Sequence, residues 1–416
     1  MAVIQFLGIF LTAIAVTSIN ISGTSSDTDT QLNLAEANNR FAFHLYQTLT
    51  EATASDNIVF SPMSISIAFG MTFLGARGNT ANQMKEVLKF NLMEESRLHS
   101  SLSKLNSAIF DVHATRYILR KANRLFGQKD LDLRHQFLHD VQKHYGSSMA
   151  SLDFVEDSEG SRQFINSWVS QETEEKIVDV LPPGHVNEMT RLVLVNAIYF
   201  KADWISKFDA SKTFDQDFYF SESEVIEVAM MHRKSKFNFA EDTSLRCKII
   251  ELPYVGKKLS MVLILPEEIN GLDTLLKHFS NEKLLHFLNN LSNVTVDLAI
   301  PKFSLEETVF MNDVLHTMGM QDLFRQDKAD LSGITGTKDL FVSTVVHRAF
   351  LEVNEEGSEA AAATAVTISA RSISHTPEFI ADHPFLFFII DSKTKAIIFM
   401  GNYRKPVGLI RNREEL

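Results

Sequence analysis

A stretch near the C-terminus, between Glu355 and Ser372, constrains the fold of this chain more than any other. Gly357 lies near its start, with a backbone that reaches conformations which other residues resist. Small, uncharged residues follow, and then a β-branched segment, V-T-I, that favours extended structure. Arg371 is the only Lys or Arg between Gly357 and Ser392. The stretch therefore combines a hinge, a run of small side chains and one basic residue at its far end.

Alternation along this stretch predicts which side chains would enter a sheet. In a β-strand, successive side chains point to opposite faces. Counting from Ser358, every second residue as far as Ile368 is uncharged, whereas Glu359 falls on the opposite face. A slip by one residue would bury that charge. The segment is thus able to become a central strand. Its four consecutive alanines also favour a helix, so a helix or a plain linker is the alternative.

The stretch resembles the hinge and reactive-centre loop of inhibitory members of the serpin superfamily of serine protease inhibitors. In that family a Glu is followed two residues later by Gly, then by a small hydroxyl residue, an Ala-rich run and a scissile bond at a fixed spacing. The resemblance implies a loop over about 355–376 whose reactive bond joins Arg371 to Ser372. It assigns the hinge to Glu355, Gly357, Ser358, Ala360, Ala361, Ala362, Ala363 and Thr364.

Five further blocks resemble the same family and occur in the family's order along the chain. They read N-I-V-F-S-P-M-S-I, L-V-N-A-I-Y-F-K-A-D-W, L-A-I-P-K-F-S-L-E, V-V-H-R-A-F-L-E-V-N-E-E-G and D-H-P-F-L-F-F-I. The resemblance implies an α+β serpin fold, with a large central sheet, surrounding helices and an exposed reactive-centre loop. It also implies a polar cluster (the shutter) where that sheet opens, and an aromatic residue (in the breach) near the point of first loop insertion. These residues are Ser61, Ser64, Asn196, His347 and, for the aromatic, Trp204.

Each of those five residues has a plainer interpretation as an ordinary buried, hydrogen-bonded side chain.

The function that the resemblance implies is irreversible suicide inhibition of a trypsin-like serine protease, which becomes covalently trapped after cleavage at Arg371–Ser372. A non-inhibitory carrier or chaperone of the same family is the alternative, although such relatives often have charged, proline or bulky hinge residues. The chain contains no G-x-S-x-G, H-E-x-x-H, P-loop or G-x-G-x-x-G motif. We therefore predict that it is not an enzyme.

Local patterns predict several elements. Ser61 is expected to cap a buried helix that begins with Pro62, and a stripe from Leu98 to Ile109 predicts another helix. A buried strand is expected from Leu192, and a hairpin around Gly256. No repeat or Pro/Gly-rich linker divides the chain, so residues 23–416 are predicted to form a single domain.

The two ends of the chain resemble targeting signals. An apolar run, Val3 to Val16, followed by small residues, predicts a signal peptide over residues 1–22 and a secreted, extracellular protein. An uncleaved anchor is the alternative. The ending Arg413 to Leu416 resembles a retrieval signal of the endoplasmic reticulum, and a similar Glu-Glu-Leu ending occurs in a secreted serpin that also has an Arg before its scissile bond. A polar tail is the other interpretation. Candidate glycosylation sequons begin at Asn20, Asn290 and Asn293.

The charge and cysteine content of the chain limit the classes of binding partner that we expect. A formal net charge of −12 argues against nucleic-acid binding, which needs a basic surface. A basic cluster comprises Arg116, Arg120, Lys121 and Arg124; it could bind a polyanion such as heparin, or could form an ordinary solvated face. Cys247, the single cysteine, is either a buried apolar residue or a free thiol able to pair between chains. No metal, other cofactor or membrane partner is predicted, and the chain is expected to be a monomer.

Overall fold

A computed structural model describes residues 22–52, 56–109, 117–356, 376–406 and 411–412, with side chains for the residues of these ranges that lie between 28 and 406. The sequon at Asn20, the hinge residues from Gly357 to Thr364, the reactive bond Arg371–Ser372 and the C-terminal tetrapeptide all lie outside the described residues. Among the hinge residues, Glu355 is described.

The described helices lie mostly in the first half of the chain. They are α1 (Ser22–Ala52), α2 (Pro62–Gly75), α3 (Gly78–Val87), α4 (Glu95–Ile109), α5 (His135–Tyr145), α6 (Ser158–Glu172), α7 (Leu272–His278), α8 (Asn281–Asn290), α9 (Met311–Thr317) and α10 (Ser332–Thr335). None of these described helices is both long enough and apolar enough to cross a bilayer.

A five-stranded sheet contains the predicted functional region. Its strands, in spatial order, are β10 (Phe303–Phe310), β11 (Thr344–Val353), β4 (Leu192–Ala202), β2 (Tyr117–Gln128) and β3 (Met149–Leu152). β10 and β2 run antiparallel to their inner neighbours, whereas β11 and β4 are parallel and pair directly. Ten of the eleven residues of β4 are buried, the exception being the half-buried Lys201, as expected for a strand that is covered on both faces.

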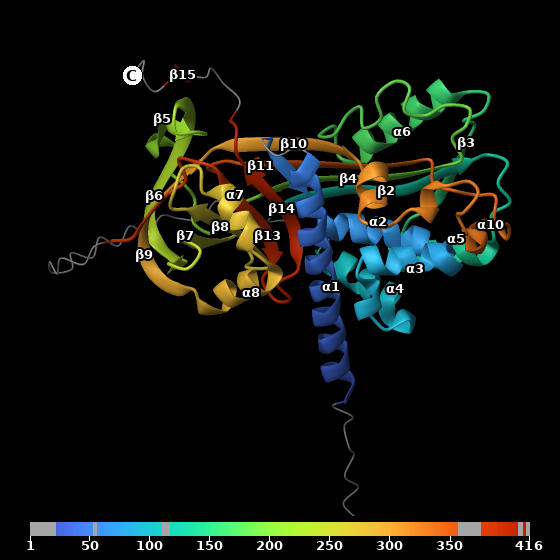
Figure 1. Ribbon diagram of the computed structural model, residues 1–416, viewed down its shortest axis with the longest axis horizontal. Helices are drawn as coiled ribbons and strands as arrows, with labels where there is room; N and C mark the ends of the chain where they lie inside the picture. Colours follow the sequence, from blue (N-terminus) through green and yellow to red (C-terminus); the bar gives the residue numbers. More distant parts are fainter. Residues whose placement is uncertain (1–21, 53–55, 110–116, 357–375, 407–410, 413–416) are drawn as a thin grey trace, which may run out of the picture.

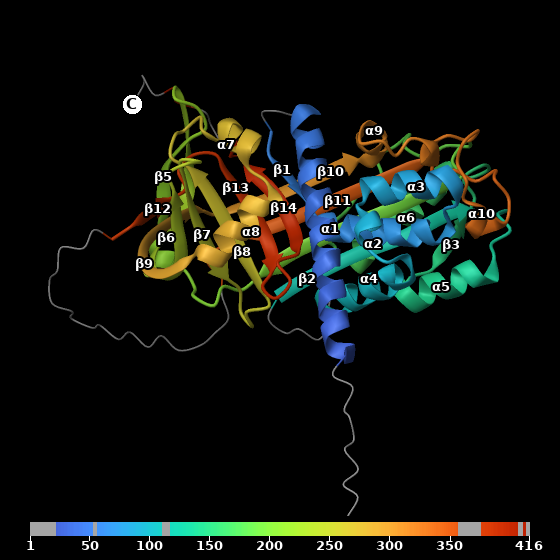
Figure 2. The same ribbon diagram turned by 60° about the horizontal axis from the view of Figure 1, so that its bottom comes forward.

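A ten-stranded sheet forms the other half of the molecule. Its main path is β1 (Ile58–Phe60), β14 (Ile397–Tyr403), β13 (Phe385–Asp391), β8 (Leu259–Pro266), β7 (Cys247–Pro253), β6 (Glu224–Asp242), β9 (Ser292–Pro301) and β12 (Glu378–Ile380), with β5 (Thr213–Tyr219) and β15 (Arg411–Asn412) also pairing to β6. Figures 1 and 2 show this sheet on one side of α1, with α2 to α6 on the other.

Helices cover both faces of the five-stranded sheet (Figure 1). The main core joins α1, α2 and α4 to one face of β2 and β4 and continues into the ten-stranded sheet. A smaller core lies on the opposite face, where Ile165 and Val169 of α6 pack with Val195 and Tyr199 of β4 and with Val346 of β11. α6 therefore covers one face of the sheet at the place where β4 and β11 pair.

The locally predicted elements are confirmed. Ser61 precedes α2, and its hydroxyl accepts a hydrogen bond from the Ser64 N–H at 3.3 Å. The predicted stripe from Leu98 to Ile109 is the buried side of α4. β7 and β8 form the predicted hairpin, with Gly256 at a φ of 88° in the connecting turn, a backbone angle that glycine adopts without strain.

Candidate functional site

The two central strands of the five-stranded sheet, β4 and β11, meet along what we call the β4–β11 seam. Their register runs in parallel from Thr344 opposite Val193 to Glu352 opposite Lys201. After β11 the described residues continue to Glu356 and end there, just inside the predicted hinge. A segment that turned back after β11 would run antiparallel to both strands of the seam, and antiparallel strands can pair on each side. The topology of the seam therefore admits one additional strand between β4 and β11.

A row of polar side chains crosses the middle of this sheet. His347 of β11 lies opposite Asn196 of β4, and Asn196 lies opposite Asn123 of β2. The His347 ring bonds the Asn196 side chain, with 2.5 Å between Nδ1 and Oδ1. The backbone N–H of Ser61 donates to His347 Nε2 at 3.1 Å. We call His347, Asn196 and Asn123 the polar row.

Ser64 completes the network below the polar row. The Asn196 amide Nδ2 donates to Ser64 Oγ at 2.6 Å and also to Asn123 Oδ1. The structure thus brings together four predicted residues, Ser61, Ser64, Asn196 and His347, and all four are buried. Asn123 was not predicted. Its only sequence signal is a polar residue in the middle of an otherwise strand-like segment.

His347 is neutral and its tautomer follows from its partners. Because Nε2 accepts the Ser61 N–H, the proton lies on Nδ1, which donates to the Asn196 carbonyl oxygen. Burial lowers the pKa of His347 to about 3, since a charged ring would lose its hydration. A second proton on Nε2 would face the Ser61 N–H, donor against donor. The network therefore requires the uncharged ring.

An aromatic group closes the C-terminal end of the seam. Trp204 is buried and stacks on Tyr254, with 4.5 Å between ring centroids and 16° between planes. Its indole N–H donates to the carbonyl oxygen of Asn354 at 2.8 Å. Since Asn354 directly follows β11, this bond ties the last turn before the predicted hinge to the chain that leaves β4.

Charged side chains hold the same end of the seam. Lys201 Nζ lies 3.0 Å from the Glu352 carboxylate and 2.7 Å from that of Glu356. Burial alone would lower the pKa of Lys201, but hydrogen bonds to both carboxylates raise it. Burial alone would likewise raise the pKa of Glu355; backbone hydrogen bonding and the Lys302 ammonium, 3.0 Å away, hold it below its usual range. The raised pKa of Lys201 and the lowered pKa of Glu355 both favour the charged forms.

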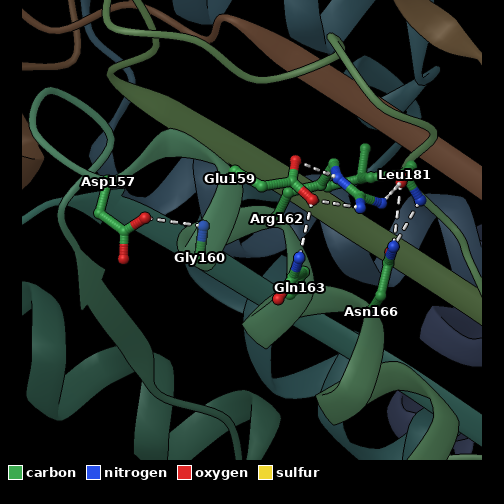
Figure 3. Close-up of polar contacts among 7 residues, drawn as sticks. All are labelled: Asp157, Glu159, Gly160, Arg162, Gln163, Asn166 and Leu181. Carbon is green, nitrogen blue, oxygen red and sulfur yellow. Dashed lines mark hydrogen bonds and ion pairs between the residues drawn. The ribbon is translucent and has the colours of Figure 1, made fainter.

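The N-terminal half of α6 is fixed to the segment that leads into β4 (Figure 3). Asp157 caps the helix by accepting the Gly160 N–H at 2.9 Å. Asn166 forms two hydrogen bonds with the backbone of Leu181, at 3.0 Å to its oxygen and 2.9 Å from its N–H. Arg162 donates a second hydrogen bond to the Leu181 carbonyl oxygen at 2.8 Å. A strand added at the seam would have to be accommodated beneath this attached helix.

Other predicted residues lie away from the seam. Asn290, at the end of α8, and Asn293, in β9, are both exposed. Cys247 is buried, as one of its two interpretations requires, and burial raises the pKa of its thiol to about 12. No group of His, Cys, Asp or Glu among the described residues could hold a metal ion.

The predicted basic cluster does not form one cationic surface. Arg116 lies outside the described residues. Arg120 pairs with Glu174 at 2.8 Å, whereas the Lys121 ammonium donates to Asn106 inside the fold. Because side chains of β2 alternate between faces, the cations of the cluster point to opposite sides of the sheet. The described arrangement gives a polyanion no continuous basic stripe at these residues.

Comparisons with known proteins agree on one family. Residues 36–406 match the family described as Serpin (serine protease inhibitor). Leukocyte elastase inhibitor from Xenopus tropicalis is 44% identical over 378 residues, 90% of this chain and 100% of that protein; the Homo sapiens protein of the same name is 44% identical over 379 residues, 90% and 99%. A structure of uncleaved ovalbumin has a TM-score of 0.84 at 33% identity, covering 89% of this chain and 99% of that one. Maspin gives a TM-score of 0.84 at 31% identity, covering 92% and 100%.

These matches confirm the predicted α+β serpin fold. They also correct the prediction, drawn from missing catalytic motifs, that the chain is not an enzyme. The family and the similar proteins are named as inhibitors of proteases. Members of this family take part in the reaction of a protease as its suicide substrate. The finding that replaces the prediction points to a protease-inhibiting protein.

Proposed function

The chain belongs to the serpin family of serine protease inhibitors, and we propose that it is an irreversible suicide-substrate inhibitor of trypsin-like serine proteases, cleaved between Arg371 and Ser372. The observation that carries the proposal is the seam, where the parallel strands β4 and β11 pair directly with no strand inserted between them. The chain that follows β11 is the small-residue hinge, which has the side chains that such a strand needs.

The proposed reaction begins when a protease attacks the Arg371–Ser372 bond and becomes acyl-linked to the Arg371 carbonyl carbon, with Ser372 released as a new N-terminus. The hinge then enters the seam by strand addition, driven by strain stored in the uninserted fold. Insertion has to outrun hydrolysis of the acyl bond. The face counted from Ser358 carries no charge, so it enters the sheet without the cost of desolvating an ionised group.

Arg371 supports a trypsin-like target, because the primary pocket of such proteases holds a carboxylate that pairs with a guanidinium group. Convertases that need Arg-x-x-Arg are poorer targets, since Ile368 occupies the fourth position before the bond. The names of the similar proteins favour a second candidate, an elastase-type target. The small primary pocket of elastase would accept Ala370, which moves the cleaved bond by one residue.

One experiment distinguishes the two targets. The purified chain is mixed separately with trypsin and with elastase, and the products are resolved on a denaturing gel and sequenced from their N-termini. We expect a band near the summed masses with trypsin, together with a small peptide that begins at Ser372. Trapping of elastase alone, with a peptide that begins at Arg371, would replace the first candidate by the second. Complete cleavage without a trapped complex would favour the carrier or chaperone alternative.

Two variants control this experiment. Arg371→Glu removes the guanidinium that trypsin binds, so trapping of trypsin should be abolished while the fold is retained. Ser358→Arg leaves the bond intact but places a charge on the inserting face, so trypsin should cut the variant and escape. Undiminished trapping by Ser358→Arg would contradict insertion as the trapping step.

We further propose that the chain is a secreted glycoprotein. Residues 1–22 would be removed as a signal peptide, Asn290 and Asn293 would carry glycans, and the ending from Arg413 to Leu416 would return part of the protein to the endoplasmic reticulum. Exposure of both asparagines supports modification. Expression in secretory cells tests the proposal: we expect a new N-terminus near residue 23 and a mobility shift after glycosidase treatment. Retention of Met1, or an unchanged mobility, would contradict the respective part.

A further inference from the structure

A small polar pocket lies beside the five-stranded sheet, away from the seam. It has a volume of about 270 Å³ and is lined by residues of α2, β2, α5 and α6 and by the connection after α5. β3 pairs with β2 only from Leu125 to Gln128, so the pocket lies where the outer edge of β2 has no neighbouring strand among the described residues. Side chains from both faces of β2 therefore reach it: Lys121 and Asn123 from one face, and Arg124 from the other.

Two residues that line this pocket each have a buried hydrogen-bond donor without an acceptor among the described residues. Arg124 Nε and Asn123 Nδ2 are shielded from solvent, and neither has a partner among the described residues. The arrangement of the Asn123 amide is fixed, because its Oδ1 already accepts from Asn196 Nδ2. Buried donors without a protein acceptor are uncommon in folded proteins, and such donors often bond a water molecule or an ion instead.

The charge at the pocket is positive. The Arg124 guanidinium lies over the Trp168 ring, 5.4 Å from its centroid, and donates to Ser148 Oγ at 3.0 Å. Within the described residues it has no carboxylate partner. Lys121 donates to Asn106, and burial lowers its pKa to about 8. Glu172 is the only carboxylate among the described lining residues, and it is exposed.

We propose that this pocket binds a small oxyanion such as phosphate or sulfate. The ligand would accept hydrogen bonds from Arg124 Nε and Asn123 Nδ2 and would be favoured electrostatically by the Lys121 ammonium, so that both unpartnered donors would be satisfied together. A water molecule occupies about 30 Å³ in the liquid, so the pocket volume suits one compact ion with a few waters. It does not suit a chain of sugars. The ligand class is therefore distinct from the polyanion considered for the basic cluster.

Asn123 connects this pocket to the polar row. Its amide group would bond the ligand through Nδ2, while its carbonyl oxygen bonds Asn196 across the sheet. Asn196 in turn bonds His347 at the seam. A bound oxyanion would thus hold Asn123 in the orientation that the closed sheet uses, and it would stabilise the native state because it binds that state in preference to the unfolded chain.

Thermal unfolding of the full-length protein in inorganic phosphate, against chloride at the same ionic strength, tests the proposal without any protease. We expect the unfolding midpoint to rise with phosphate and to saturate. Arg124→Gln should raise the phosphate concentration needed at least tenfold, because a charge-assisted hydrogen bond is lost. Arg120→Gln is the matched control: it removes the same charge from the same strand, but it lies outside the pocket lining, so the phosphate response should be unchanged.

A second variant keeps the test decisive if Arg124→Gln does not fold. Asn123→Asp retains an oxygen that accepts from Asn196 but replaces the unpartnered donor by a second acceptor, so the phosphate effect should disappear. A midpoint insensitive to both phosphate and sulfate would overturn the proposal. An equal loss of the phosphate effect in Arg124→Gln and Arg120→Gln would also overturn the proposal, because it would indicate general surface charge. Displacement of phosphate by a heparin oligosaccharide to the same extent in both variants would overturn it for the same reason.

Discussion

The β4–β11 seam is closed in two places by different chemistry. At its centre, His347 and Asn196 are buried and joined by uncharged hydrogen bonds. At its C-terminal end, Lys201 pairs with Glu356, whose side chain remains 67% exposed. Bonds at the exposed end can be exchanged for bonds to water at little cost, whereas those at the centre leave buried groups unpaired when broken. The seam is therefore weakest at the end from which the proposed loop would enter.

Asn196→Ala should give the largest effect, because it breaks the centre. The change leaves the His347 Nδ1–H without its acceptor and leaves the Asn123 side-chain oxygen with only the Ser64 hydroxyl, 3.5 Å away; we expect the free energy of unfolding to fall by about 3 kcal/mol. Chemical denaturation followed by circular dichroism measures this. Asn293→Ala, at an exposed position, is the control and should change stability by less than about 0.5 kcal/mol. Equal effects of the two changes would contradict the distinction between centre and surface.

Acid should weaken the centre next most strongly. In the unfolded chain, His347 gains a proton below about pH 6.5, whereas in the folded protein its pKa is about 3. The stability that this difference provides is therefore present above pH 6.5 and is lost as the pH falls toward 3. At pH 5 the loss is about 2 kcal/mol.

The contribution of His347 can be separated from that of other groups. Burial also lowers the pKa of His99, to about 4, so the wild-type protein responds to acid at more than one site. We expect His347→Gln to lose about 2 kcal/mol less than wild type between pH 7 and pH 5, measured as free energies of unfolding at each pH. Parallel pH profiles for the two proteins would show that His347 does not titrate as inferred.

Trp204→Phe should have a smaller effect, because it tests one bond at the C-terminal end. Phenylalanine keeps an aromatic ring against Tyr254 but leaves the Asn354 carbonyl oxygen without its indole donor. We expect a loss of about 1 kcal/mol, measured by chemical denaturation. A decrease in the free energy of unfolding as large as that of Asn196→Ala would show that the centre and the C-terminal end of the seam are equally sensitive to the loss of a hydrogen bond.

Glu356→Gln should give the smallest effect and the one most sensitive to salt. An ion pair at the surface contributes about 0.5 kcal/mol, and the carboxylate of Glu356 is the exposed member of the Lys201–Glu356 pair. The difference between variant and wild type should vanish in about 1 M salt, where charges are screened within roughly 3 Å. The effect of Asn196→Ala should persist there. A salt-dependent effect of Asn196→Ala, or a salt-independent effect of Glu356→Gln, would contradict the distinction between uncharged bonds at the centre and an ion pair at the end.

Sequence was sufficient for the features that depend on near neighbours. Ser61 and Pro62 predict the start of α2 because cap and helix are adjacent in the chain, and the turn at Gly256 predicts the hairpin for the same reason. The family resemblance, carried by short blocks, identified His347 and Asn196, which the structure then brings together. What these features share is that each depends on residues within one block.

Features that depend on the pairing of distant strands could not be predicted. Asn123 belongs to the polar row only because β2 meets β4 in one register, and nothing within β2 fixes that register. The basic cluster was misleading for a related reason. Its residues are close in sequence, but their partners are distant in sequence: Arg120 forms an ion pair with Glu174, and Lys121 donates a hydrogen bond to Asn106.

The measurement that tests insertion at the seam most directly compares the intact and the cleaved protein. The chain is cut between residues 364 and 372 by a protease that it does not trap, and both forms are unfolded by heat under the same conditions. We predict that the unfolding midpoint of the cleaved form rises strongly, because the freed segment becomes a strand between β4 and β11 and hydrogen-bonds to both. An unchanged or lower midpoint after complete cleavage would contradict insertion at the seam.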